Sequence, residues 1–244
     1  MIGIIGYGMV GKAVEYGFPN TQHIISDPFY NEITIQDVVS AGPEAIFVCV
    51  PTPTDETQYT ILDTVLNDII YKSRYQGLTV VKSTVLPKYL EKFDIIFNPE
   101  FLSRATSYQD FISPPLVVIG GNRAADLLDV YNKYSIVDTS RTFLTDVKTA
   151  ALVKYTFNTF YATKITFMNQ MYDVAEQMGV NFKDVIDIVQ HHPWVGTSHL
   201  QVPGPDGERG FGGPCLPKDT AALVREYDLP LLDTVLSLNS QYRP

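Results

Sequence analysis

A cysteine near the end of the chain has the surroundings of a chemical nucleophile. Cys215 follows the glycine-rich segment 210–214, and Pro217 stands two residues further on. Proline favours the start of a helix, because its missing N–H would be unpaired there. The dipole and unpaired N–H groups of a helix N-terminus favour a thiolate over a thiol. Asp219, one turn into that helix, would lie near the sulfur. The sequence predicts a reactive thiolate, with a buried structural cysteine as the alternative.

A second stretch, at the start of the chain, has the spacing of a phosphate-binding turn. An apolar run at residues 1–6 leads into Gly-x-Gly-x-x-Gly, and helix-like sequence follows from Lys12. The first glycine permits the tight turn, the second lets the backbone approach a pyrophosphate, and the third lets the helix pack on the strand. The phosphates would rest on the helix N-terminus. This pattern predicts a dinucleotide site at Gly6, Tyr7, Gly8, Met9, Val10 and Gly11.

An acidic residue follows at the distance expected for a ribose contact. Asp27 ends the next predicted strand, residues 23–27, and lies 19 residues after Gly8. A carboxylate there accepts hydrogen bonds from the ribose hydroxyls of NAD and repels the extra phosphate of NADP. We therefore expect NAD, with a turn aspartate before Pro28 as the alternative.

Strands alternate with helices through the first part of the chain. Strands are expected at residues 1–6, 23–27, 45–50, 78–84, 94–97 and 116–119, and helices near 12–15, 35–39 and 60–75 and after 121. This order predicts an α/β fold with a Rossmann-type, doubly wound parallel sheet. Polar residues recur where strands end, at Asp27, Thr52, Thr84 and Glu100, and the loop 51–54 follows the third strand. Ligands bind at that edge of such sheets.

From about Thr142 the pattern changes to helix. Residues 146–178 contain no proline or glycine, Gly179 is a plausible C-cap, and further helices are expected from 182, from 216 to 227 and from 229 to 239. We expect a Rossmann domain at residues 1–141 and an all-helical domain with a long central helix at 142–244. Lys154 and Asn158 are four residues apart, so they share a face of that helix, and apolar neighbours favour their burial.

The composition and net charge exclude several classes of binding partner. The 244 residues are 45% apolar and 18% charged, as in globular proteins, and the net charge is −9. The negative charge argues against nucleic acid or an anionic membrane surface. No apolar run reaches the ~18 residues that span a bilayer, and no signal peptide is evident. Two cysteines, Cys49 and Cys215, make no disulfide framework, so we expect a cytoplasmic protein. His191-His192 lacks partners at ligand spacing, so no metal is expected.

Taken in order, six motifs resemble the UDP-glucose/GDP-mannose dehydrogenase family. They are residues 6–11, Cys49-Val-Pro-Thr-Pro53, Ser83-Thr-Val85, Asn98-Pro-Glu-Phe-Leu102, Lys154-x-x-x-Asn158 and 210–219. The resemblance implies a Rossmann NAD domain and a helical domain that forms a homodimer through its long helix. It also implies NAD-dependent oxidation of the C6 alcohol of a nucleotide sugar to the uronate in two steps, with UDP-glucose as the first candidate, and a place in polysaccharide biosynthesis.

The residue types suit that reaction. Lys154 and Asn158 can take the alcohol proton and stabilise the oxyanion. Cys215 can capture the aldehyde as a thiohemiacetal, which becomes a thioester and is hydrolysed. Asp219 would help orient Lys154 and the water. By resemblance, Glu100 is the general base or acid, and Thr84 helps hold the water.

The resemblance also assigns contacts. Besides residues 6–11, those to the cofactor are Asp27, Val50, Pro51, Thr52, Ser83, Thr84 and Lys218. Those to the substrate are Phe101, Leu102, Ser103, Arg104, Lys154, Asn158, Arg209, Gly212 and Gly213.

The chain departs from the family pattern in its substrate-recognition residues. The family's second nucleotide-binding domain is absent from these 244 residues. Trp194-Val-Gly196 replaces Arg-Ile-Gly, Arg104-Ala105 replaces Glu-Gly, and Ala151 replaces a glutamate. Arg209 or Arg225 could replace the lost cation. Two alternatives stay open: a one-step alcohol dehydrogenase of the β-hydroxyacid type that does not need Cys215, and a non-catalytic NAD-binding partner protein.

Overall fold

The computed structural model describes residues 1–53 and 59–243. The chain divides into two compact units, residues 1–154 and 155–244, and the division falls inside the long helix α7 (Val147–Met178). Residue 54, the end of the loop predicted after the third strand, lies outside the described residues.

A seven-stranded sheet forms the centre of the first unit, in the order β2-β1-β3-β4-β5-β6-β7. The strands are β1 (Ile2–Ile5), β2 (His23–Ser26), β3 (Ala45–Val48), β4 (Leu78–Val81), β5 (Ile96–Phe97), β6 (Val117–Gly120) and β7 (Thr142–Thr145). All pairs are parallel except β5 with β6, which pair antiparallel through Phe97 and Gly120. The expected Rossmann-type sheet is confirmed, although it is mostly rather than wholly parallel.

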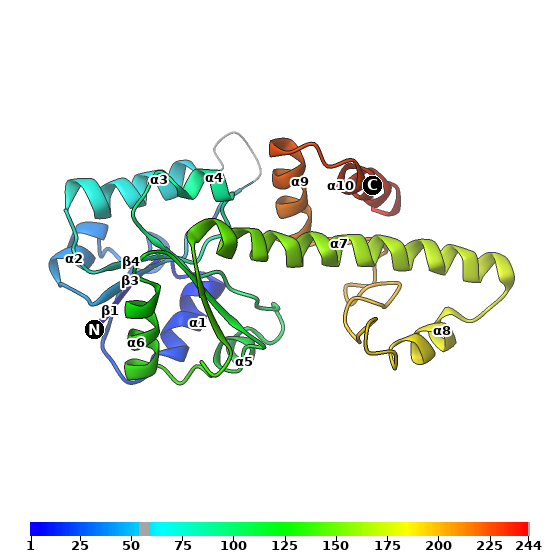
Figure 1. Cartoon of the computed structure of the whole chain (residues 1–244), viewed down its shortest axis with the longest axis horizontal. Helices are drawn as coiled ribbons and strands as arrows, with labels where there is room; N and C mark the ends of the chain where they lie inside the picture. Colours follow the sequence, from blue (N-terminus) through cyan, green and yellow to red (C-terminus); the bar gives the residue numbers. More distant parts are fainter. Residues whose placement is uncertain (54–58, 244) are drawn as a thin grey trace. The chain divides into compact units, whose positions relative to one another are not determined.

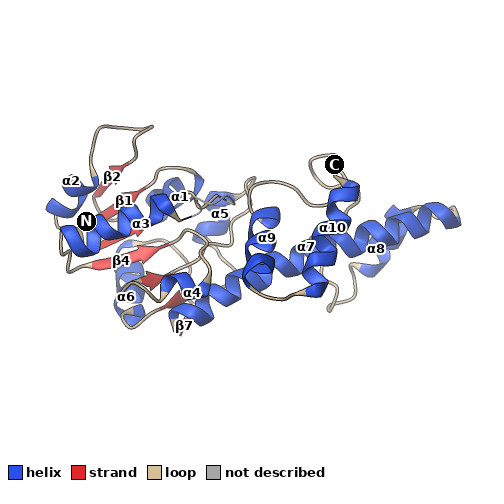
Figure 2. Ribbon diagram, turned by 90° about the horizontal axis from the view of Figure 1, so that it is seen from above, coloured by secondary structure: helices blue, strands red, loops and turns tan. Residues whose placement is uncertain are grey.

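Helices cover both faces of this sheet (Figures 1 and 2). The bounds are α1 (Met9–Gly17), α2 (Ile35–Ser40), α3 (Thr60–Leu66), the π-helix η1 (Asn67–Lys72), α4 (Pro87–Leu90), α5 (Ser107–Ile112) and α6 (Ala124–Tyr134). Apolar side chains of α1, α5 and α6 pack on one face, and those of α2, α3, η1, α4 and the start of α7 pack on the other. Strands buried on both faces read as continuous apolar runs, which is why they could be predicted.

One expectation about the elements was wrong. Residues 142–145 form strand β7, paired in parallel with β6, whereas the sequence was interpreted as turning to helix there. Phe143 and Leu144 of β7 are exposed, so the strand has no buried apolar run to mark it. The single helix expected at 60–75 is α3 followed by η1.

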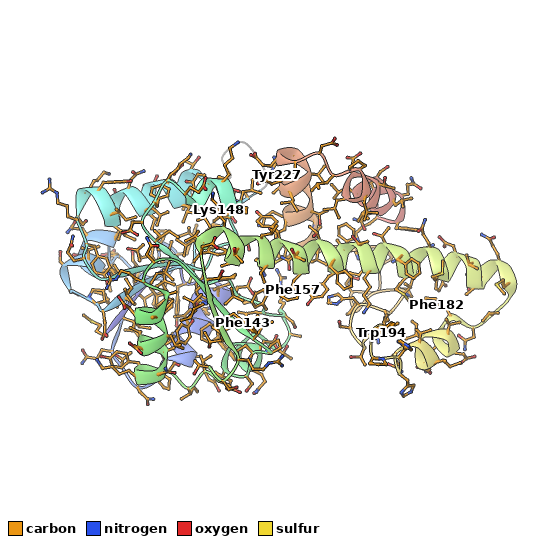
Figure 3. The ribbon with its side chains drawn as sticks, in the orientation of Figure 1. Phe143, Lys148, Phe157, Phe182, Trp194 and Tyr227 are labelled. Atoms are coloured by element: carbon orange, nitrogen blue, oxygen red, sulfur yellow. The ribbon has the colours of Figure 1, made fainter. Side chains whose placement is uncertain are left out.

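The second unit consists of helices, as expected. It contains the remainder of α7, then α8 (Phe182–Val189), α9 (Leu216–Glu226) and α10 (Pro230–Tyr242). Gly179 has φ +68° after α7, as expected for a C-cap. Phe182 of α8 is buried against Met168 and Ala175 of α7, whereas Trp194 stands 92% exposed (Figure 3).

No helix in residues 1–53 or 59–243 has the length and apolar character needed to cross a membrane.

Candidate active site

The turn between β1 and α1 has the geometry of a phosphate cradle. Gly6 has φ +89°, and a Cβ there would lie 2.7 Å from the carbonyl oxygen of Cys49. A Cβ on Gly11 would lie 2.1 Å from the carbonyl oxygen of Gly6, so the third glycine lets the helix pack close. Around Gly8 no atom lies within 4 Å of a Cβ position, and Gly8 caps α1 without a side-chain hydrogen bond. The open space and the N–H groups at the start of α1 fit the pyrophosphate of NAD.

Asp27 lies directly beside this turn. Its Oδ2 accepts a hydrogen bond from the backbone N–H of Tyr7 at 2.6 Å, and its Oδ1 accepts from that of Phe29 at 2.8 Å. The ring of Tyr7 packs against Tyr30 with 4.4 Å between centroids. The main chain thus fixes the Asp27 carboxylate at the end of β2, where it could accept hydrogen bonds from the ribose hydroxyls of NAD.

The loops after β3 and β4 are joined by side-chain hydrogen bonds. Ser83 donates from Oγ to the carbonyl oxygen of Val50 at 2.6 Å, and Thr52 donates from Oγ1 to that of Thr84 at 3.0 Å. Val50, Thr52 and Ser83 are buried, whereas Pro51 is exposed and Thr84 is half-buried. The structure therefore brings these five predicted residues together at the carboxyl edge of the sheet.

Glu100 and Lys154 form a buried pair in the first unit. Lys154 donates from Nζ to the carbonyl oxygen of Glu100 at 2.6 Å and lies 3.2 Å from its Oε1, and the side chains are 5% and 9% exposed. The other carboxylate oxygen accepts from the N–H of Leu102 at 2.7 Å, and Lys154 lies over the ring of Phe101. Burying two charges is costly, so this pair is a candidate for chemistry rather than for stability.

In the second unit the predicted residues cluster around Asp219. Asn158 donates from Nδ2 to Oδ2 of Asp219 at 2.5 Å, Lys218 lies 2.5 Å from Oδ1, and Asp219 is 1% exposed. Cys215 is the N-cap of α9 and is exposed, which argues against the buried structural alternative. Pro217 is the second helical residue, not the first as expected.

The segment before Cys215 is fixed to α7 and α10. Arg209 forms a salt bridge with Asp173 at 2.6 Å, donates to Asn169 at 3.1 Å, and lies between the rings of Tyr172 and Tyr242. Arg209 therefore packs the segment into the second unit, and its contact with substrate stays a prediction. No local pattern predicts this role of Arg209, because its partners Asn169 and Asp173 lie on α7 and Tyr242 lies near the end of the chain.

Asn239 and Arg243 complete this attachment. Asn239 accepts from the N–H of Phe211 at 2.7 Å and donates to its carbonyl oxygen at 3.0 Å. A Cβ on Gly212 would lie 2.0 Å from Nη1 of Arg243, so a larger residue there would displace that guanidinium. Gly213, with φ +74°, has no atom within 4 Å of a Cβ position, which leaves space next to Pro214 and Cys215.

Other predicted contacts lie at the surface of their units. Ser103 and Arg104 are exposed, and the N–H of Ser103 donates to Asp110 at 2.8 Å. Arg225 is exposed, and the exposed ring of Trp194 stands edge-on to His192. No group of three or more His, Cys, Asp or Glu side chains suited to a metal ion was found among the described residues. The structure thus gathers the candidate catalytic residues into two groups, one in each unit.

The sheet, the glycine turn and Asp27 define the first unit as an NAD-binding Rossmann domain. Residues 21–135 match the NAD binding domain of the UDP-glucose/GDP-mannose dehydrogenase family, and residues 148–241 match its central domain. The chain belongs to this family.

Named relatives agree with this assignment. A UDP-glucose 6-dehydrogenase of Rickettsia felis is 34% identical over 219 residues, which are 81% of this chain and 48% of the relative. A GDP-mannose 6-dehydrogenase of Pseudomonas syringae is 30% identical, over 79% of this chain and 50% of the relative. A UDP-glucose dehydrogenase structure from Pyrobaculum islandicum matches with TM-score 0.84 and 26% identity, over 98% of this chain and 68% of that one. The chain spans about half the length of the curated relatives it matches.

Proposed function

We propose that the protein oxidises the C6 alcohol of a nucleotide sugar to the uronate in two NAD-dependent steps, with UDP-glucose as the first candidate substrate. The observation that carries the proposal is the exposed Cys215 at the N-terminus of α9, with Asp219 buried one turn along and bonded to Asn158. A thiol needed only for packing would be covered by apolar side chains. The family supports the same class of reaction.

NAD, when bound, accepts the hydride removed in each oxidation. The residues that would hold it are the turn from Gly6 to Gly11, Asp27, and the linked loops at Thr52 and Ser83. Lys218, which lies against Asp219, is a further proposed contact.

In the first oxidation the alcohol oxygen gives its proton to the side chain of Lys154, the C6 hydrogen leaves as a hydride, and negative charge develops on the oxygen as the proton transfers. Lys154 and Asn158 supply the N–H donors that stabilise this oxygen, and a buried site strengthens that effect. The product is an aldehyde. Its carbonyl carbon is attacked by the sulfur of Cys215, which forms a C–S bond and a thiohemiacetal whose oxygen takes up a proton.

The second oxidation leaves a thioester on Cys215. Glu100 takes a proton from water, the water oxygen attacks the acyl carbon, and the C–S bond breaks to release the thiolate and the carboxylate product. Thr84, half-buried at the carboxyl edge of the sheet, helps hold the water, and Asp219, which is hydrogen-bonded to Asn158, helps orient it. Phe101 to Arg104, Arg209, Gly212 and Gly213 are the proposed substrate contacts.

The test measures NADH formed per nucleotide sugar consumed by the whole protein, using UDP-glucose, GDP-mannose and UDP-N-acetylmannosamine. Two NADH per sugar, with a uronate product, is the expected result. One NADH per substrate that survives Cys215→Ala would instead indicate a one-step alcohol dehydrogenase. NAD binding by calorimetry without turnover of any sugar would indicate a binding protein.

We also propose that a second copy of the chain packs on α7. Phe160, Phe167, Val174 and Met178 are exposed and recur at spacings of seven, seven and four residues, which places them in one stripe. Such a stripe of large apolar side chains favours association. Light scattering of the wild type should give a dimer, and Phe167→Glu should give the monomer. A monomeric wild type would contradict the proposal. A cytoplasmic location stays a prediction from the sequence.

A further inference from the structure

Lys82 is a buried lysine just beyond β4 to which the proposed mechanism gives no role. It is 3% exposed, and its Nζ donates to the main-chain carbonyl of Asn98 at 3.0 Å and to the side-chain Oδ1 of Asn98 at 2.9 Å. Asn98 also donates to the carbonyl of Val118 at 2.8 Å and accepts from the hydroxyl of Tyr131 at 2.7 Å. One ammonium group therefore holds both carbonyl oxygens of the residue that follows β5.

The other end of the same short segment is held by a second buried lysine. Asn98 is followed by Pro99 and Glu100, and Lys154 donates to the carbonyl oxygen of Glu100. Two ammonium groups thus bind the main chain on either side of Pro99. Lys82, Asn98, Pro99 and Glu100 also line one cavity. The position of the Glu100 carboxylate consequently depends on both lysines.

The charge of Lys82 is not balanced by a carboxylate of its own. Lys82 makes no salt bridge within the part of the chain that the structure describes, and its ammonium lies over the ring of Phe111. Burial lowers the pKa of Lys82 to about 8, with Cys49 and Glu100 acting to raise it and Lys154 acting to lower it. Lys82 is therefore a cation below about pH 8.

The groups around Lys82 come from five elements. Burial raises the pKa of Cys49, after β3, to about 12, so Cys49 is a neutral thiol. Burial also raises the pKa of Tyr131, on α6. Asp110 of α5 lines the same cavity and is bonded to Ser103 and Thr106, while Glu100 after β5 is paired with Lys154 of α7. Because Glu100 and Lys154 neutralise each other, Lys82 adds an excess positive charge beside the carboxylate.

We propose that Lys82 is a positioning residue for Glu100. Its ammonium fixes the segment from Asn98 to Glu100, and this holds the Glu100 carboxylate where it can accept a proton from water. The proposal rests on the proposed function, in which Glu100 acts as the base.

The test compares the whole protein with Lys82→Met, which removes the charge at similar length, and with Lys82→Arg, which keeps it. Lys133→Met on α6 is the control, because the Lys133 side chain is exposed and contacts Glu44 and the ring of Tyr134 rather than the segment from Asn98 to Glu100. We expect Lys82→Met to lower kcat about tenfold or more with little change in KM, because the base is misplaced while the substrate contacts are kept. Lys82→Arg should restore part of kcat, and Lys133→Met should match the wild type.

Hydrogen–deuterium exchange of residues 98–103 gives a readout that needs no turnover. We expect faster exchange in Lys82→Met than in the wild type. Lys82→Gln, which removes the charge but keeps an N–H donor, should exchange at a rate between those of Lys82→Met and the wild type. It supplies the comparison if Lys82→Met fails to fold.

Exchange at the wild-type rate in a folded Lys82→Met or Lys82→Gln would overturn the proposal, as would a folded Lys82→Met with the kcat of the wild type. A wild type without turnover of any nucleotide sugar would overturn the proposed function instead, and the exchange data would still show whether Lys82 holds the segment.

Discussion

Two glycine-rich turns each lead into a helix N-terminus, and they are built in opposite ways. The turn at residues 6–11 packs against main chain of its own sheet, since a Cβ on Gly6 or Gly11 would strike backbone oxygens. The segment at 210–213 is held by side chains, through Asn239 on Phe211 and Arg243 over Gly212. Local geometry shapes the first turn and distant residues shape the second. Cofactor binding is therefore built into a strand–turn–helix unit, whereas placement of the thiol depends on α7 and α10.

The largest expected effect is a difference in activity between variants of the two cysteines, Cys215 after the second turn and Cys49 beside the first. Cys215→Ser should lower uronate formation on the order of 10³-fold or more, because the aldehyde loses its covalent partner. Cys49→Ser should keep turnover within a few-fold of the wild type, since burial holds Cys49 as a thiol. NADH production by both variants measures this. A Cys49→Ser variant as inactive as Cys215→Ser would remove the distinction.

Within the first turn, two alanine substitutions should behave differently. Gly11→Ala places a Cβ 2.1 Å from the carbonyl of Gly6, so we expect a loss of about 3 kcal/mol or more in the free energy of unfolding, together with loss of NAD binding. Gly8→Ala meets no atom within 4 Å, so it should fold normally and weaken NAD about tenfold by entering the phosphate space. Thermal melts and calorimetry test the pair. Equal NAD affinity for Gly8→Ala and the wild type would argue against the cradle.

Within the second segment, Asn239→Ala removes both hydrogen bonds to the main chain of Phe211. We expect a loss of about 2 kcal/mol in the free energy of unfolding, because two buried backbone groups lose their partners. Iodoacetamide labelling of Cys215, with Cys49 as an internal reference, should change rate, while NAD affinity stays at the wild-type value. Ser237→Ala, on the same helix, is the matched control. An unaltered labelling rate in Asn239→Ala would show that the segment does not need this attachment.

The smallest effects are expected in the pH dependence of the free energy of unfolding, which should differ between the two regions. Lys82, near the first turn, has a lowered pKa of about 8, so the unfolded state binds more protons between about pH 8 and 10.5. Stability attributable to Lys82 should therefore rise with pH there, by at most about 1.4 kcal/mol per pH unit. The stability difference between wild type and Lys82→Met, measured by denaturant titration, should show this slope. If the stability difference between the wild type and Lys82→Met did not change with pH, the pKa of Lys82 would not be lowered by burial.

The second segment should respond to acid instead. The hydrogen bond from Arg243 lowers the pKa of Asp206, so this contribution is present above the ordinary aspartate range and is lost as pH falls through the lowered value. Arg243→Met should flatten that acid limb. If the acid dependence is the same in both proteins, the Asp206–Arg243 pair does not stabilise the segment.

The same contrast explains what could be predicted from sequence. The strands, the glycine turn and Asp27 were predictable because their patterns are local and the strands are buried on both faces. Strand β7 was missed because Phe143 and Leu144 face outward on an edge strand. The antiparallel pairing of β5 with β6 rests on one residue pair, which no local pattern marks.

The sequence indicated which residues form the candidate site, but not which of them contact one another. The Lys154–Glu100 and Asn158–Asp219 pairs join residues 54 and 61 positions apart, so spacing alone could not assign partners. Lys82 was overlooked because a lysine after a strand is usually exposed, and nothing in its neighbours marks its burial. The contact of Arg209 with substrate stays a prediction, and its bonds to Asp173 and Asn169 are marked by no local pattern in the sequence.

The proposed mechanism requires a covalent bond between the sulfur of Cys215 and the substrate carbon. The deciding measurement is mass spectrometry of the acid-quenched protein after mixing with NAD and UDP-glucose, using Glu100→Gln to slow thioester hydrolysis. We expect the peptide that contains Cys215 to carry an added nucleotide-sugar mass, and this modification should require both NAD and the sugar. An unmodified Cys215 peptide in a protein that continues to form NADH would contradict it.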